Sequence, residues 1–578
     1  MAKIRKIEIK NFRSIKSLTW LPLPGVNCLI GPGDIGKSTI LDAIDLCLGA
    51  RRSISISDAD FHSLDIGCAI SITLTLGDLE DSLKSIEAYG IYFQAFNSET
   101  GEVLEEPKRG LETVLNLNLT INDDLEPEWS LVSGRATSQG LTKNIAWKDR
   151  VAIAPMRLGS YENSNFSWSK GSVLNRLSDQ KIEAGELLAQ VAREARNTFG
   201  AYTDEQLSST LALVIKAANE LGVEIGDAAK AMLDVRSVSF TNGAISLHDN
   251  NGVPLRNLGT GSSRLLIAGL NQNSINKTKI ILVDEVEHGL EPHRLTRLLN
   301  ALGSKSQDPV SQVFLTTHSP VALRELSGDQ LYVVRRSSDE HVLTPIGISN
   351  QMQGAIRVYP ESFLASTVIV CEGASEVGFI RGMDERRSES GKLSLSARGV
   401  SYVDAKGGSP DECLKKAMVY LTLGYKTIAF LDGDLEISGE ILQEFQKAGG
   451  ILVGWRDDRA IEDELFLSLT DDGVDLLIKY AIQFTDRTLV NNSLLENSDR
   501  KFSLESIEKI TAENSGEYSE ELRLILAKSS KMKKRGWFKT IGRMEIIAKD
   551  VIFPRLEISD PGFVDVIEKL FFEAHDKA

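Results

Sequence analysis

The sequence predicts an α/β protein with two α/β units, a helical insertion within the first and a helical part after the second. A short apolar strand at 26–30 enters a glycine-rich loop that opens a helix. Residues 171–235 are rich in Ala, Leu, Glu and Arg and contain no proline, which is typical of helices. From 361 to 460, apolar strands alternate with helical segments, which predicts a parallel sheet with helices on both faces.

The first unit opens with a half-buried strand over residues 4–12, where Ile and Phe alternate with charged residues. Residues 68–80 and 114–121 predict further strands, which we expect to pair antiparallel. After the helical stretch, strands are expected at 236–247, 279–285, 313–319 and 331–336.

These elements predict four segments. They are an N-terminal lobe (1–165), a helical insertion (166–235), a C-terminal lobe of the same unit (236–350), and a second α/β domain with a helical end (361–578). Two interpretations of the insertion stay open: an arm that makes a dimer contact, or a helical subdomain packed on its own core.

Composition excludes several classes of protein. The five cysteines lie far apart and form no CxxC pair, which argues against a disulfide framework and a thiolate zinc site. No run approaches the roughly 18 apolar residues of a membrane helix, so we expect a cytoplasmic protein without a membrane partner. The net charge of -16 argues against a general polyanion binder, so any DNA contacts must be local.

The string GPGDIGKS matches the phosphate-binding pattern GxxxxGK[ST] and lies between a strand and a helix, as that pattern requires. Its glycines let backbone N–H groups surround phosphate, Lys37 would neutralise the outer phosphates, and Ser38 would ligate Mg²⁺. The alternative is a glycine-rich turn before an ordinary helix. The expected nucleotide-binding residues here are Gly31, Gly33, Gly36, Lys37, Ser38 and Thr39.

Three later features complete this candidate site. The strand IILVDE ends in Asp284, suited to Mg²⁺, and Glu285, suited to activating water. A second phosphate-facing turn contains Gly259, Gly261 and Ser262, and His318 follows another apolar strand, where it could sense the γ-phosphate. The alternatives are a solvated acidic turn and a capped loop histidine.

These four elements, with the opening IRKIEIKNFRSIKS, resemble the ABC-type ATPase heads of the RecF/SMC class over residues 1–50 and 255–325. The resemblance implies ATP held between two heads, and hence a homodimer or higher oligomer. The chain departs from the class at the signature turn, which is GTGS and not the fuller LSGGQ form.

Acidic residues follow two strands of the second unit. Glu372 and Glu376 follow STVIVC, and Asp432 and Asp434 follow TIAFL. Because the carboxyl ends of parallel strands meet at one edge, we expect these carboxylates to converge, and oxygen ligands of this kind suit Mg²⁺ or Mn²⁺. The order EGxxE, AKGG, DGD resembles the TOPRIM fold.

A third acidic group, Glu462-Asp463-Glu464, comes later, and its alternative is a solvated helix start. A basic run at 528–543 interleaves Trp537 and Phe538 with cations, so it could contact phosphates while the aromatic rings anchor it or stack. The alternative is a solvated basic helix.

An ABC-type ATPase followed by TOPRIM resembles the OLD (overcoming lysogenization defect) family, which includes Gabija-type and retron-associated defence nucleases. The resemblance implies an ATP-regulated, divalent-metal-dependent DNA endonuclease in anti-phage defence. It implies two metal ions in the TOPRIM site, one with ATP, and a possible helicase, or reverse transcriptase with its non-coding RNA, as partner. Carried over, Glu372, Glu376, Asp432, Asp434, Glu462 and Glu464 match the metal ligands, and Lys539 matches the lysine that stabilises the transition state.

Two alternatives remain at this stage. One is a DNA-repair ATPase of RecF/SMC type that does not cleave DNA, and the other is an ATP-binding sensor scaffold whose TOPRIM site is degenerate. The register of metal binding within Glu462-Asp463-Glu464 also stays open.

Overall fold

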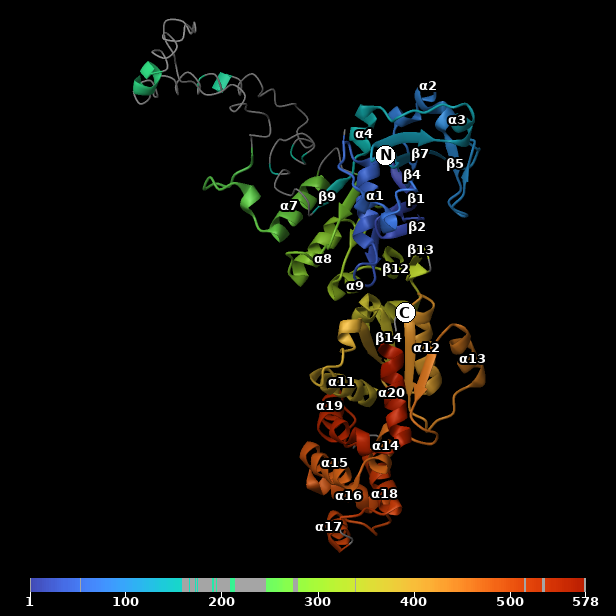
Figure 1. Cartoon of the computed structure of the whole chain (residues 1–578), viewed down its shortest axis with the longest axis vertical. Coiled ribbons are helices and arrows are strands. Elements are labelled where there is room, and N and C mark those ends of the chain that lie inside the picture. The colour runs from blue at the N-terminus through green and yellow to red at the C-terminus, as the bar shows by residue number, and fades with distance from the viewer. Residues whose placement is uncertain are drawn as a thin grey trace. The chain divides into compact units, whose positions relative to one another are not determined.

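The computed structural model describes residues 2–51, 53–158, 246–273, 279–337, 339–513, 516–532 and 536–575, with Phe166, Ser172, Leu174, 190–191, 194 and 208–213. Most of the expected insertion at 166–235 and most of the strand expected at 236–247 lie outside these residues. The chain divides into an N-terminal unit (Met1–Cys28 and Ser38–Glu325) and a C-terminal unit (Leu29–Lys37 and Leu326–Ala578) (Figure 1).

Antiparallel strands form the first part of the N-terminal unit. β1 (Lys3–Phe12) pairs with β2 (Ile15–Trp20) and β4 (Ile70–Gly77), and β4 pairs with β7 (Glu112–Ile121). The antiparallel pairing expected from the sequence is therefore confirmed. The sheet continues through three shorter strands, β5 (Gln94–Phe96), β6 (Val103–Leu104) and β8 (Pro127–Val132).

Parallel strands form the second part of this unit. β10 (Ile280–Val283) lies between β9 (Met156–Leu158) and β11 (Gln312–Thr316) and pairs parallel with both. β10 and β11 are buried along their whole length, which explains their uninterrupted apolar runs. Their shared direction brings the residues after β10 and β11 to one edge of the sheet.

The described helices of this part of the chain are α1 (Lys37–Leu48), α2 (Ile86–Tyr89), α3 (Gly134–Ser138), α4 (Trp147–Ile153), α7 (Thr260–Asn273), α8 (Pro292–Ala301) and α9 (Pro320–Glu325). β3 (Val26–Ile30) leads through the glycine-rich loop into α1, as the sequence predicts.

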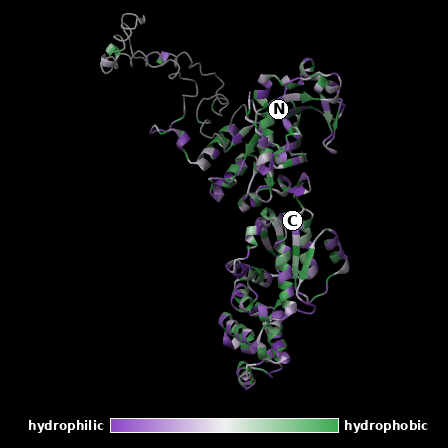
Figure 2. Ribbon diagram, in the orientation of Figure 1, coloured by the Kyte–Doolittle hydropathy of each residue, from purple (hydrophilic) through white to green (hydrophobic). Residues whose placement is uncertain are grey.

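The C-terminal unit contains the parallel sheet expected at 361–460. Its strand order is β15-β14-β16-β17, and each neighbouring pair runs parallel. The strands are β14 (Thr367–Cys371), β15 (Val400–Asp404), β16 (Lys426–Leu431) and β17 (Ile451–Gly454). β14 is wholly buried, and the strands of this sheet are coloured largely hydrophobic in Figure 2.

The order of these strands fixes where a ligand can enter. The chain steps from β14 to β15 in one direction and from β15 to β16 in the other, and crossovers of this kind are right-handed. α11 (Ala374–Glu389) therefore lies on the face opposite to α12 (Pro410–Leu421) and α13 (Gly439–Lys447) (Figure 1). The crevice between the carboxyl ends of β14 and β16 is thus the switch point of the sheet, where ligands of open α/β sheets bind.

The remaining elements of this unit lie before and after the sheet. β12 (Leu331–Ser337) and β13 (Glu340–Pro345) form an antiparallel hairpin that is counted with this unit. The other described helices are α10 (Asn350–Val358), α14 (Ile461–Ser468), α15 (Asp471–Phe484), α16 (Arg487–Asn497), α17 (Leu504–Glu513), α18 (Glu520–Ser530), α19 (Ile541–Ile547) and α20 (Pro561–His575). Apolar side chains of the helices from α14 to α20 join those of the sheet in one core.

Within the described part of the chain, none of the helices combines the length and apolar composition needed to cross a bilayer.

Candidate functional site

The glycine-rich loop has the backbone that its sequence requires. Gly31 has a φ of +140°, and a Cβ there would lie 2.8 Å from the carbonyl oxygen of Val334. Gly36 has a φ of +96°, which also favours glycine, whereas Gly33 faces open space. Lys37 is buried and donates hydrogen bonds to the carbonyl oxygens of Gly31 (3.0 Å) and Pro32 (2.7 Å), so its ammonium lies over its own loop.

In the N-terminal unit, a chain of hydrogen bonds joins Ser38 to the ends of two strands. Ser38 Oγ donates to Asp284 Oδ1 at 3.0 Å, and Thr316 Oγ1 donates to the same oxygen at 2.6 Å. Arg157 approaches the other oxygen of Asp284 at 3.9 Å and also pairs with Asp42 of α1. Ser38 and Asp284, predicted independently as Mg²⁺ ligands, therefore lie together.

The residues around Asp284 are held by their main chains. Glu285 has a φ of +46° and an exposed side chain; its N–H donates to Thr316 Oγ1 (2.8 Å), and Arg264 donates to its carbonyl oxygen (2.7 Å). His318 is also exposed, and its N–H donates to Glu287 Oε1 at 2.7 Å. Both predicted side chains are thus exposed, and the carboxylate of Glu285 lies 3.9 Å from Nδ1 of His288.

The second glycine turn is closely packed. A Cβ on Gly261 would overlap the carbonyl oxygen of Gly289, so only glycine fits at the start of α7. Ser262 Oγ accepts a hydrogen bond from Arg294 at 3.2 Å, while Gly259 is exposed with open space around it. Thr39 Oγ1 lies 3.3 Å from the hydroxyl of Ser14.

In the C-terminal unit, Glu372 and Asp432 meet at the switch point of the parallel sheet. The main-chain N–H of Asp432 donates to Glu372 Oε2 at 3.0 Å, and Glu372 N–H donates to the Phe430 carbonyl at 3.0 Å. Asp432 Oδ1 accepts from the N–H of Ile461, the first residue of α14, at 3.0 Å. The two carboxylates therefore connect β14, β16 and α14.

Two further carboxylates are buried beside them. Glu376 and Glu462 are each only 3% exposed. Glu376 Oε2 accepts from the N–H of Gly373 at 2.9 Å. Among the described residues Glu462 Oε1 has no hydrogen-bond donor, and the ammonium of Lys539 lies 3.9 Å from it. We define the acidic cluster as Glu372, Glu376, Asp432 and Glu462.

Burial raises the pKa of every member of the acidic cluster. The pKa of Asp432 rises to about 9, through burial first and then the negative charges of Glu376, Glu462 and Glu372. The pKa of Glu376 rises to about 8 for the same reasons. Burial also raises the pKa of Glu372 and of Glu462, the latter against the opposing charge of Lys539. Such a cluster favours a bound cation or a shared proton.

Lysines compensate part of this negative charge. Lys531 pairs with Asp463 and lies 3.7 Å from Asp434, whose side chain is exposed. Lys531 and Lys539 both come from the basic run, so the sequence located the cations correctly but assigned a role only to Lys539. Lys533, Lys534 and Arg535 lie outside the described residues.

Glu464 is not part of the acidic cluster. Although fully buried, it accepts hydrogen bonds from Arg456 (2.8 Å) and Ser468 (2.6 Å) and pairs with Arg459 at 3.2 Å. Burial alone would raise the pKa of Glu464, but these donors lower it. Within Glu462-Asp463-Glu464 the structure therefore brings only Glu462 to Asp432, and Glu464 fixes the start of α14.

The aromatic residues of the basic run are core residues. Trp537 and Phe538 are fully buried and pack against Phe466 of α14. They anchor the segment that carries Lys539 and cannot stack on nucleic-acid bases, as one expectation had it.

The donor set suits a hard divalent cation. Within the described ranges, no group of three or more His, Cys, Asp or Glu side chains stands ready to hold a metal ion. The acidic cluster nevertheless supplies only carboxylate oxygens, which Mg²⁺ and Mn²⁺ prefer, and Oε1 of Glu462 is a buried acceptor with no hydrogen-bond donor among the described residues. The oxygen ligands of the acidic cluster therefore fit Mg²⁺ or Mn²⁺ in their chemistry.

Sequence reasoning missed several residues of both sites. Thr316 and Arg157 hold Asp284, and Glu287 holds the loop of His318, yet no pattern marks them because their contacts join distant segments. The doubled threonine in TTHSP was the one available signal for Thr316.

The phosphate loop and the Ser38–Asp284 pair define a nucleotide-binding ATPase. The chain belongs to the family described as "AAA domain, putative AbiEii toxin, Type IV TA system", whose model matches residues 26–324, a little over half of the chain.

Two relatives show how far the similarity extends. The chain is 23% identical over 367 residues to a protein named OLD nuclease from Thermus scotoductus, covering 59% of this chain and 63% of that protein. It is 24% identical over 112 residues to the DNA replication and repair protein RecF of Chlorobium phaeovibrioides, covering 18% of this chain and 30% of RecF. The match spans less than two thirds of either relative.

Among solved structures, the chain is similar to an Smc head bound to the C-terminal winged-helix domain of ScpA. That likeness covers 59% of this chain and 97% of the other, at 14% identity and a TM-score of 0.31. At this TM-score the likeness adds nothing to the description of the fold.

Proposed function

We propose that this protein is an ATP-regulated, divalent-metal-dependent DNA endonuclease, built as an ABC-type ATPase head followed by a TOPRIM nuclease domain. The family of the ATPase domain and the partial similarity to an OLD nuclease support the proposal. The observation that carries it is the acidic cluster, four carboxylates gathered at the switch point of a parallel sheet with Lys539 beside them.

The carboxylates and Lys539 would have different roles in phosphodiester hydrolysis. Glu372, Glu376, Asp432 and Glu462 would hold Mg²⁺ or Mn²⁺, with Asp434 at the exposed rim. When bound, two such ions supply Lewis acidity at the attacking and leaving oxygens. Lys539 places a fixed positive charge near Glu462, where it stabilises negative charge that develops on the phosphoryl group. Glu464 is left out because it neutralises Arg456 and Arg459.

The ATPase residues take the roles that their chemistry allows. Lys37 would neutralise the outer phosphates of ATP, Ser38 and Asp284 would hold its Mg²⁺, and Glu285 would orient the attacking water. Gly259, Gly261 and Ser262 would face the nucleotide of a second copy, which makes a homodimer part of the proposal. A cytoplasmic role in anti-phage defence belongs to the same proposal and rests on the resemblance to OLD nucleases.

Cleavage of supercoiled plasmid in Mn²⁺, with and without ATP, tests the proposal. We expect wild type to nick or linearise the plasmid, Asp432→Ala to lose at least about a hundredfold in rate, and Lys539→Ala to lose about tenfold to a thousandfold. Lys447→Ala is the matched control, because this exposed lysine of α13 lies outside both the basic run and the acidic cluster. If Asp432→Ala cleaves as wild type does, the nuclease assignment is wrong.

A second candidate is a DNA-repair ATPase of RecF type that does not cleave. The match to RecF favours it. ATP hydrolysis that DNA stimulates, together with intact plasmid in every metal tested, would establish this candidate and exclude the first.

A further inference from the structure

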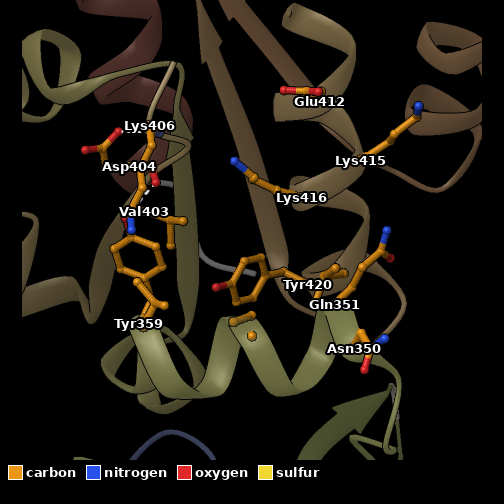
Figure 3. A pocket seen from close by; sticks show the side chains of 14 residues that line it. Asn350, Gln351, Tyr359, Val403, Asp404, Lys406, Glu412, Lys415, Lys416 and Tyr420 are labelled. Atoms are coloured by element: carbon orange, nitrogen blue, oxygen red, sulfur yellow. Dashed lines mark hydrogen bonds between the residues drawn. The ribbon is translucent and has the colours of Figure 1, made fainter. Parts of the chain in front are cut away.

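A cavity of about 610 Å³ opens between α10 and α12 of the C-terminal unit (Figure 3). One wall is the loop 405–408, which follows β15. This loop is tied to the segment carrying Glu372, because Gly407 N–H donates to the Glu372 carbonyl (2.8 Å) and Ala405 N–H donates to the Cys371 carbonyl (2.9 Å). The same loop thus borders the cavity and is hydrogen-bonded to the main chain of Glu372, although none of the four acids of the cluster lines the cavity.

The floor of the cavity is aromatic and apolar. Tyr359 and Tyr420 both line it, with Val358, Val403 and Val419 around them (Figure 3). Their hydroxyls are engaged: Tyr359 donates to the Asp404 carbonyl at 2.6 Å, and Tyr420 accepts from Ser362 at 2.8 Å. Tyr359 is half-buried, so its ring, held at the hydroxyl end, offers a rigid surface of the kind that planar heterocycles favour. Tyr420 is only 1% exposed and packs against Phe363 and Tyr425, so it supports this floor without offering a ring face of its own.

The rim of the cavity carries an excess of positive charge. Lys406, Lys415 and Lys416 line it, against Asp404 and Glu412. Lys416 reaches inward and donates to the carbonyl oxygen of Ala405, whereas Lys415 stands at the outer edge (Figure 3). Asp404 Oδ1 accepts a hydrogen bond from the main-chain N–H of Lys406 at 2.6 Å, so this carboxylate already has a partner within the loop. The aromatic floor would not help to bind a simple inorganic anion, and the lysines would not help to bind an apolar ligand. The lining therefore favours a ligand that has both an aromatic ring and a negative charge.

We propose that this cavity binds a nucleotide, with the base against Tyr359 and the phosphate at Lys406 and Lys416. The nucleotide is either a free nucleoside monophosphate or one residue of a DNA strand that passes the acidic cluster. The DNA source rests on the proposed function, because it places the strand next to the cleavage site, whereas the free nucleotide does not.

Binding measured in EDTA tests the inference without any cleavage. The full chain carries Lys37→Ala, so that the phosphate loop contributes little to nucleotide binding. Calorimetry follows the four deoxynucleoside monophosphates and inorganic phosphate, and fluorescence anisotropy follows a short single-stranded oligonucleotide. The test variants are the pair Lys406→Ala with Lys416→Ala, which removes charge, and Ala355→Trp, which fills the cavity. Lys447→Ala, on exposed α13 surface outside the cavity, is the matched control.

We expect a loss of affinity of about tenfold or more in both test variants and none in the control. A loss with monophosphates identifies a free nucleotide as the source, and a loss with the oligonucleotide alone identifies a DNA strand. Unchanged binding of both ligands overturns the inference, and so does phosphate binding as tightly as the monophosphates. If Ala355→Trp does not fold by circular dichroism, the lysine pair alone decides. A plasmid left uncut would contradict the proposed function and leave this result intact.

Discussion

At the scale of single residues, the buried charge of Asp432 has a measurable consequence for stability. Folding raises its pKa to about 9, from about 3.9 in an unfolded chain. An acid whose pKa is raised by folding destabilises the folded state when it ionises. Without metal, the contribution of Asp432 is therefore most favourable below about pH 4 and declines as the pH rises toward 9.

Asp432→Asn keeps the acceptor for the Ile461 N–H and removes this charge. In EDTA at pH 8 we expect the free energy of unfolding to rise by about 1–2 kcal/mol, or about 3 °C or more in Tm. At pH 4 wild type and variant should melt together, and Mn²⁺ should stabilise wild type far more than the variant. Scanning calorimetry measures all three, and a lower Tm of the variant at pH 8 would show that the carboxylate is ionised and stabilised.

Glu462 and Glu464 are neighbours in sequence whose substitutions should act in opposite ways. Glu464→Gln leaves Arg456 and Arg459 without their buried partner, so we expect a loss of about 2–4 kcal/mol in urea unfolding. Glu462→Gln removes a buried charge whose Oε1 no hydrogen bond satisfies, so it should cost little stability but weaken Mn²⁺ binding measured by titration. Equal losses of stability in the two variants would contradict the assignment of Glu462 to the cluster.

At the scale of elements, the loop after β16 depends on one close approach. A Cβ on Gly433 would overlap the carbonyl oxygens of Arg456 and Trp455, and this glycine lies between Asp432 and Asp434. Gly433→Ala must push the loop away from the segment after β17. We expect a loss of about 1–3 kcal/mol and weaker Mn²⁺ binding. Gly439→Ala, at the start of α13 with open space around it, is the matched control and should change neither property.

The sequence predicts those parts of the site that depend on strand ends. Glu372 and Asp432 follow apolar strands directly, so parallel pairing was enough to bring them together. Ser38 and Asp284 were found in the same way, from a loop pattern and a strand end. Both pairs can be predicted from local sequence patterns, without knowing which distant side chains they contact.

The remaining features depend on contacts between distant segments. The choice of Glu462 over Glu464 is made by Arg456 and Arg459, which no acidic pattern reveals. Trp537 and Phe538 look like nucleic-acid contacts beside so many cations, yet tertiary packing against Phe466 buries them. The cavity lies between α10 and α12, which β14 and β15 separate in the sequence, so no single stretch of sequence predicts it.

At the scale of the whole molecule, the ATPase residues and the acidic cluster carry separable chemistry. Asp432→Ala should leave ATP hydrolysis at the wild-type rate, because Asp432 contacts residues of the C-terminal sheet and α14. Lys37→Ala should abolish ATP hydrolysis, measured by phosphate release, and leave Mn²⁺ binding by the acidic cluster unchanged. The effect of Lys37→Ala on plasmid cleavage then gives the sign of ATP regulation: faster cleavage means that ATP restrains the nuclease, and slower cleavage means that it activates it. Loss of ATP hydrolysis in Asp432→Ala would show that one centre serves both reactions, against the division of labour proposed above.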